Sequence, residues 1–260
     1  MTKLITLALA AVVAASLAGC GSLNNDTPPP VVDAAATPTA NTTTEKPSEK
    51  PLVGTIGEKL AYGNFLGKNI TWECLAIDIS DKDNPKALLT STDIVFYWPF
   101  NASGGEAAWA DSTLRDLLNG KFYDDAFTDA QRAKIIPADI DGAADKVFLL
   151  SLEEATLYFA DDAARIVSYN ATDAQMDALA QAIADASDTE GWAAPYTVDN
   201  ALSDLIMYNG TTDKWWLRTS DESLTRASCV SYNGAVGTDS SLVKQLQAVR
   251  PVMWVTLKAE

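Results

Sequence analysis

The sequence predicts an α+β fold: a single domain with a mainly antiparallel sheet and flanking helices, placed after a disordered tether. Three observations predict it. Residues 70–77 show the two-residue alternation of a strand and residues 86–97 a second apolar run, residues 109–187 carry helix caps and helical spacing, and residues 215–257 return to strand patterns. Strands, then helices, then strands without regular alternation are typical of α+β domains.

The first predicted strands form a β-hairpin or a meander. Residues 78–85 read as a polar turn, and residues 86–97 form a second apolar run after it. Alternation places one set of side chains of the first strand on a common face: Ile70, Trp72, Cys74 and Ala76.

Helices are predicted from their caps. Ser112 begins a helix that Asn119-Gly120 ends, and Thr128 begins a further helix that Pro137 stops. A buried strand at 146–150 runs into a capping box, in which Ser151 is followed three positions later by Glu154, and this helix reaches about Phe159. A second box, Thr172 with Gln175, begins an Ala-rich helix that ends near Ser187.

Strands return at 215–219, 226–232 and 249–257, with Asn233-Gly234 as a hairpin turn. Trp215 and Trp216 point to opposite faces of a strand, so we expect at most one of them to face the core, while the other covers a helix or lines a groove. Arg218 and Arg250 stand beside large apolar neighbours, and a buried guanidinium needs carboxylates or carbonyls as partners. We expect both arginines to connect strands to loops; a ligand carboxylate or phosphate is the alternative.

The first nineteen residues predict export. Lys3 precedes an apolar run over residues 4–18, which has the length of a signal peptide core and is short of a membrane span. Leu17-Ala18-Gly19-Cys20 resembles the lipobox of bacterial lipoproteins. That resemblance implies that residues 1–19 are a lipoprotein signal peptide and that Cys20 is acylated and becomes the first residue of the mature chain. The alternative is an ordinary secretory signal with Cys20 present by chance.

A Pro- and Thr-rich segment separates this signal from the rest of the chain. Residues 20–51 contain few large apolar side chains, so they cannot bury enough surface to offset the entropy of ordering. We interpret residues 20–51 as the acylated N-terminus and a disordered linker, and residues 52–260 as one globular domain of a size that supports a single core. The protein is then expected on a cell membrane, lipid-anchored on the extracytoplasmic side, with the lipid bilayer as its partner through acylated Cys20.

Composition excludes several classes of function. The chain has 19 basic and 35 acidic residues, a net charge of −16, and no histidine. Nucleic acid is not expected as a partner because a phosphate backbone is repelled by such a surface. Mechanisms that use imidazole as a general base or as a zinc ligand are excluded.

The remaining chemistry is limited. We expect no catalytic residues, no metal site and no cofactor, since the acidic clusters Asp81-Lys82-Asp83-Asn84 and Asp139-Ile140-Asp141-Gly142 lack the closing Glu of a calcium loop and are interpreted as polar turns. With Cys20 acylated, Cys74 and Cys229 form an even pair in an exported protein. Two interpretations stay open for this pair: a disulfide, or two buried cysteines that act as small apolar residues.

Four blocks of sequence then resemble a known family. They are Trp109 to Gly120 with its following aromatic residues, Val147 to Ala155, Trp215 to Arg218, and Val249 to Val252. In this order they are similar to a bacterial domain family of unknown function (six-two-seven-three), over roughly Gly57 to Leu257. That family in turn is similar to C-type-lectin-like and sulfatase-modifying-factor folds, although here Val249 stands where those relatives have Phe and Ala248 where they often have Gly. The resemblance implies a lectin-like fold; the catalytic motif of the sulfatase-modifying enzymes is not evident.

These observations together predict a membrane-anchored lipoprotein that presents a non-catalytic module for a glycan or protein ligand. Flat aromatic rings stack on sugars and anchor interfaces, so the candidate ligand-binding residues are the loop aromatics Trp98, Trp192, Tyr196 and Tyr232. Two alternatives stay open: a cell-envelope hydrolase that uses a carboxylate pair, and a structural or assembly lipoprotein of the envelope.

Overall fold

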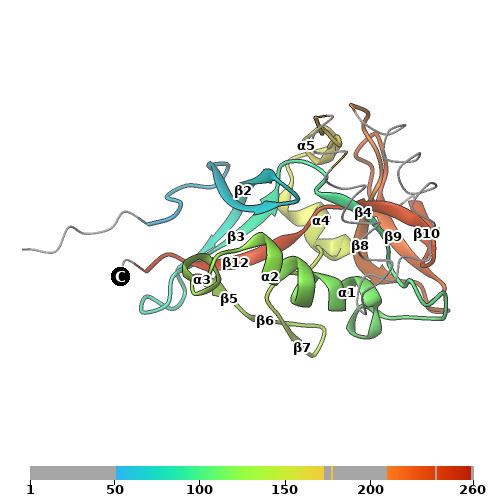
Figure 1. The fold of residues 1–260 in the computed structure, drawn as a ribbon, viewed down its shortest axis with the longest axis horizontal. Helices are drawn as coiled ribbons and strands as arrows, with labels where there is room; N and C mark the ends of the chain where they lie inside the picture. The colour runs from blue at the N-terminus through green and yellow to red at the C-terminus, as the bar shows by residue number, and fades with distance from the viewer. Residues whose placement is uncertain (1–50, 173–176, 178–209, 238, 259–260) are drawn as a thin grey trace, which may run out of the picture. The chain divides into compact units, whose positions relative to one another are not determined.

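A computed structural model describes residues 51–172, 177, 210–237 and 239–258. Its elements form two five-stranded sheets and a small two-stranded one. In the order in which the strands pair, the first sheet contains β1 (Lys59–Phe65), β2 (Lys68–Asp78), β3 (Lys86–Ser91), β12 (Val252–Thr256) and β5 (Ile135–Ile136). The second contains β10 (Asp239–Leu242), β9 (Arg226–Val230), β8 (Trp215–Ser220), β11 (Leu246–Val249) and β4 (Phe96–Pro99). Figure 1 shows the strands of the first sheet at the left and those of the second at the right.

The helices are short and lie mainly between β4 and β8 along the chain. They are η1 (Trp109–Asp111), α1 (Thr113–Leu117), the π-helical turn η2 (Leu118–Phe122), α2 (Tyr123–Ala126), α3 (Asp129–Arg132), α4 (Leu152–Tyr158) and α5 (Asp162–Arg165). The small sheet pairs β6 (Ala138–Ile140) with β7 (Ala143–Asp145). Strand pairing is antiparallel except between β11 and β8, so the predicted class of mainly antiparallel sheet with flanking helices is confirmed.

The predicted helix caps are confirmed by their hydrogen bonds. Ser112 accepts from the amide of Arg115 at the start of α1. Thr128 begins α3 with a complete capping box, and Ser151 begins α4 with another in which Glu154 is the returning partner. Each cap satisfies an amide that the first turn leaves without an intrahelical acceptor, which explains why such short helices begin where they do. The predicted helix from Thr172 to Ser187 lies outside the described residues, apart from its start and Asp177.

The end predicted for the first helix was wrong. The helix does not end at Asn119-Gly120. Instead, α1 continues directly into the π-helical turn η2, where Gly120 has φ −106° and ψ −107°. Asn119 instead accepts hydrogen bonds from the amides of Lys146 and Val147 and donates to the carbonyl of Val147, at 2.7, 3.2 and 2.9 Å. Residues 147–150 are buried, as predicted, but they form no strand: Phe148 makes a bridge to Val252, and the carbonyl of Leu150 accepts from the amide of Arg218 at 2.9 Å.

The alternation in β2 holds only as far as Cys74. Ile70, Trp72 and Cys74 are buried, as predicted, but Leu75 is also buried and Ala76 is half-buried. The cause is a bulge between Cys74 and Ala76 in the pairing with β3. One extra residue shifts the side-chain phase, so the placement of Ala76 on the same face as Cys74 was wrong.

The last predicted strand, 249–257, is two strands in different sheets. β11 ends at Val249, and β12 begins at Val252. Pro251 has no amide hydrogen to give to a ladder, which favours a break at this position. The chain therefore passes from the second sheet to the first at Arg250-Pro251, and β12 then lies between β3 and β5.

Candidate functional site

Two hollows of the described surface lie beside the β1–β2 hairpin, and a third lies elsewhere, lined by Gly104, Gly105, Glu106, Thr225, Leu242, Val243 and Lys244. The two central residues of the hairpin, Leu66 and Gly67, have φ of 50° and 78°, the positive values that a tight two-residue hairpin turn needs. Leucine is an unusual residue at such a position. No Asn-Gly pair marks this turn in the sequence, which explains why the hairpin was not predicted.

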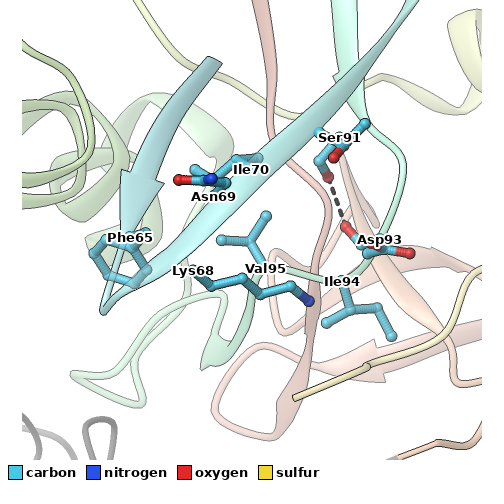
Figure 2. Close-up of a pocket in the computed structure, with 9 residues that line it drawn as sticks. Phe65, Lys68, Asn69, Ile70, Ser91, Asp93, Ile94 and Val95 are labelled. Atoms are coloured by element: carbon cyan, nitrogen blue, oxygen red, sulfur yellow. Dashed lines mark hydrogen bonds between the residues drawn. The ribbon is translucent and has the colours of Figure 1, made fainter. Parts of the chain in front are cut away.

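One hollow, of about 20 Å³, lies against the turn end of this hairpin (Figure 2). Apolar side chains of Phe65, Ile70, Ile94 and Val95 line it together with Lys68, and the Ser91 hydroxyl donates to the carbonyl of Asp93 beside it. The amine of Lys68 ends near Asp93 and Ile94 in this view. The volume is below the range of roughly 300–1,000 Å³ that is usual for ligand pockets.

Lys68 already has partners in this hollow. Its Nζ donates to the carbonyl of Asn170 and lies 5.9 Å from the ring centroid of Tyr169. Burial lowers the pKa of Lys68, and the negative charge of Asp93 opposes this change. The lysine thus connects the hairpin to the segment around Tyr169, and the hollow serves packing better than it serves a ligand.

A wider groove lies on the other side of β1, against the helical segment. This groove is an open concavity of about 520 Å³ between the hairpin and α2–α3. Its lining residues are Ala61, Tyr62, Gly63, Asn64, Asn69, Asp125, Ala126, Phe127, Thr128 and Gln131. The Tyr62 hydroxyl donates to the carbonyl of Gln131 at 2.7 Å, so the two walls are joined by a direct hydrogen bond. Sequence reasoning missed this groove, since its residues come from segments far apart in the chain.

Arg218 connects β8 to a turn and to a helix start. On β8 it donates to the carbonyl of Leu149, to Asp141 and to both oxygens of Glu154. Glu154 also accepts from the amide of Ser151 in the capping box, at 2.9 Å. The arginine therefore connects a strand to the start of α4, and its donors are occupied by the protein itself.

Arg250 lies where the chain passes between the sheets. It is 2% exposed, and its Nε donates to the carbonyl of Ser91 at the end of β3, at 2.7 Å. Its guanidinium stacks over the rings of Phe159 and Trp215, 4.8 and 5.2 Å from their centroids. Within the described part of the chain its Nη1 has no hydrogen-bond partner. Burial lowers the pKa of Arg250 to about 10, so it stays charged at neutral pH and is held largely by the two rings.

Both tryptophans of β8 are buried. Trp215 is 1% exposed and donates to the carbonyl of Arg165, while Trp216 is fully buried and donates to the carbonyl of Trp98. They do lie in different surroundings: Trp215 packs on Phe159, and Trp216 packs on Phe100. Both faces of β8 are therefore covered.

A further buried ion pair was not predicted. Asp145 is fully buried and accepts from the indole of Trp109 and from Nε of Arg115, both at 2.7 Å. Burial raises the pKa of Asp145, and the hydrogen bond from Trp109 and the charge of Arg115 oppose this change. The carboxylate is enclosed by its partners and connects the small sheet to η1 and α1.

The predicted ligand-binding aromatics do not form one site. Trp98 lies in β4 and is 7% exposed, so its assignment to an exposed loop was wrong. Tyr232 is 65% exposed in the turn after β9, and its role in binding stays a prediction. Trp192 and Tyr196 lie outside the described residues, as does Cys20.

Cys74 and Cys229 are free thiols. Cys74 lies on β2 of the first sheet and Cys229 on β9 of the second, and both are buried. Burial raises the pKa of both, that of Cys229 to about 12. The disulfide considered from the sequence is not formed, and both cysteines fill space as small apolar residues.

The family model for a domain of unknown function, DUF6273, matches residues 84–257, which is more than half of the chain. The chain belongs to the DUF6273 family. The match begins at Asn84, later than the Gly57 expected from the sequence, so the β1–β2 hairpin of this DUF6273 domain precedes the matched span. Searches of curated proteins and of solved structures return no match. Among the described residues, no helix has both the length and the apolar character needed to cross a bilayer.

Proposed function

We propose that this DUF6273 protein is a membrane-anchored lipoprotein, acylated at Cys20, that presents a non-catalytic binding module on the extracytoplasmic side. The sequence Leu17-Ala18-Gly19-Cys20 after an apolar run supports the anchor. Acyl chains contribute about 0.8 kcal/mol per buried methylene, so a multiply acylated terminus binds firmly to a bilayer. The Pro- and Thr-rich segment 20–51 supports a spacer between the bilayer and the domain.

The observation that carries the binding role is the groove beside the β1–β2 hairpin. It is open, it is walled by two elements that are hydrogen-bonded to each other, and its volume is in the range of ligand sites. Charged contacts of the described core, around Asp145, Arg218 and Glu154, join protein groups to one another. A ligand, either a glycan or a surface protein, is then bound without chemistry.

We also propose the wider relationship to C-type-lectin-like folds. The features that support it are the tryptophan- and arginine-bearing strand β8, the Gly234 turn, and the closing β11 strand followed by Arg250. This relationship is a matter of fold, and the ligand is argued from this chain's own residues.

Metabolic labelling tests the anchor. Cells that express the full chain are fed a clickable fatty acid, and the protein is isolated and probed for label in the wild type, in Cys20→Ser, and in Cys229→Ala as a control. We expect label in the wild type and in the control, and none in Cys20→Ser. An unlabelled wild type, or label that persists in Cys20→Ser, contradicts acylation at this residue.

Incubation of the purified protein with envelope polysaccharide tests the non-catalytic role. We expect retention of the protein on the polymer without release of new reducing ends. A time-dependent release of reducing ends that requires the intact protein would instead indicate the hydrolase.

A further inference from the structure

We propose that the groove between the β1–β2 hairpin and α2–α3 binds a neutral, polyhydroxylated chain such as a polysaccharide. This inference rests on the proposed binding role and names its site and its ligand class. Three properties of the groove support it: the rigidity of the two walls, the hydrogen-bonding groups that they leave open, and the charge of the lining.

The walls are held close together before any ligand arrives. Gly63 has φ 81°, and a Cβ placed on it would lie 2.8 Å from both the carbonyl oxygen of Ala126 and the ring of Phe127. Only a glycine permits so close an approach of β1 to α2. The rings of Tyr62 and Phe127 pack with centroids 5.9 Å apart beneath the groove. A preformed site loses less entropy when it binds.

Both walls present amide side chains with unused hydrogen-bonding capacity. On the hairpin, Asn64 donates through Nδ2 to Oδ1 of Asn69 at 2.9 Å, and both side chains are exposed. Among the described residues, Asn64 Oδ1 then has no donor and Asn69 Nδ2 has no acceptor. An open acceptor and an open donor thus lie next to each other on one wall, an arrangement that complements a hydroxyl group, which both donates and accepts.

The opposite wall adds a further donor. Oε1 of Gln131 accepts from the amide of Thr128 at 3.0 Å and from its hydroxyl at 3.2 Å, which fixes the direction of the amide group. Its Nε2 has no acceptor in the part of the chain that the structure describes. Because the capping box of α3 holds this side chain in place, the donor is oriented before binding.

The charge of the lining favours a neutral ligand over an anionic one. Asp125 is the charged residue of the lining, and its carboxylate is paired with Lys121 at 2.6 Å. No basic side chain lines the groove within the described residues, and the whole chain carries a net charge of −16. Phosphate or uronate groups would find no counter-charge here, whereas neutral hydroxyls match the amides.

The test measures binding of the purified full chain, in a detergent without a sugar head group, to soluble neutral polysaccharides. A glucan, a mannan and an N-acetylglucosamine polymer are compared with a polyuronate by affinity electrophoresis. We expect retardation by at least one neutral polymer and none by the polyuronate.

Two variants locate the site. Asn69→Asp keeps the size of the side chain and the acceptor for Asn64 but removes the open donor, and we expect roughly fivefold weaker binding. The double variant Asn64→Ala/Asn69→Ala removes both open groups, and we expect at least tenfold weaker binding. Asn84→Ala removes an exposed amide from the β2–β3 turn, outside the groove, and should bind like the wild type. The thermal midpoint of each variant is measured alongside to show that it is folded.

Each contrary outcome is distinct. Binding of a neutral polymer that the groove variants leave unchanged overturns the site while the binding role stands. Retention by the polyuronate alone, or by a protein partner alone, overturns the ligand class in the same way. A full chain that is labelled at Cys20 but binds no polymer overturns this inference without touching the anchor.

Discussion

Gly234 provides the sharpest test of the packing. It lies in the turn after β9 with φ 85°, and a Cβ added there would be 1.7 Å from the carbonyl oxygen of Asp162 and 2.5 Å from its carbon. Real Cβ contacts are essentially never shorter than 3.0 Å, so Gly234→Ala must move two backbones apart by about 1 Å. The movement also strains the hydrogen bond from Arg165 Nε to the Gly234 carbonyl, now 2.8 Å.

The expected cost has two parts. A non-glycine residue at this φ costs about 1 kcal/mol, and overpacking against a backbone costs about 2 kcal/mol more. Gly142→Ala is the matched control, because Gly142 has φ 86° and nothing within 4 Å of the added Cβ. It should lose only the first part, about 1 kcal/mol.

Urea unfolding of the full chain, followed by tryptophan fluorescence, measures both variants. We expect Gly234→Ala to lose about 3 kcal/mol of unfolding free energy through a lower midpoint at an unchanged slope. Equal losses in the two variants would refute the close approach of the β9–β10 turn to α5, because only the shared φ would then matter.

Three further predictions concern a buried arginine and the two buried thiols. Arg218→Lys keeps the charge but loses the bidentate contact with Glu154, so we expect the free energy of unfolding, measured in urea, to fall by about 2 kcal/mol. The control Arg226→Lys should lose about 1 kcal/mol or less. Equal losses in the two variants would contradict the framework role of Arg218. Cys74 and Cys229 should resist alkylation at pH 8 in the native chain and both react after unfolding without reductant, whereas a lack of free thiols would indicate a disulfide. Burial raises the pKa of Cys229 to about 12, above the pKa of about 8.5 of a thiol in an unfolded chain. The buried neutral thiol of Cys229 should therefore contribute its full stabilisation below about pH 8.5, and this contribution should fall as the pH rises towards 12. Urea unfolding at increasing pH measures that fall.

The fold was predictable where the signal is local. Ser112, Thr128 and Ser151 act on amides three positions away, so their caps could be identified without any knowledge of tertiary structure. The passage of the chain at Arg250-Pro251 and the bulge after Cys74 depend on pairing partners elsewhere in the chain, and local pattern could not reveal them.

The candidate site was predictable to a smaller degree. Residue type suggested Trp98 as a surface aromatic, but the second sheet buries it, since its exposure depends on which face β4 presents. The groove combines Asn64 with Gln131, which are 67 positions apart and carry no motif. An amide on the surface is ordinary; it becomes a candidate only when the opposite wall is known.

The four sequence blocks that carry the resemblance all contribute residues to the core. Trp109 donates to Asp145, Arg218 binds Glu154, and Arg250 donates to Ser91, so each block that carries the resemblance has a structural partner. The β1–β2 hairpin, which forms one wall of the groove, precedes the matched span that begins at Asn84.

Membership of the family therefore indicates the framework more directly than the ligand. Loops and hairpins on a shared framework commonly carry recognition. We accordingly expect the ligand of this chain to depend on Asn64 and Asn69 of the hairpin more than on any residue in the four family blocks, and the hairpin variants test that difference directly.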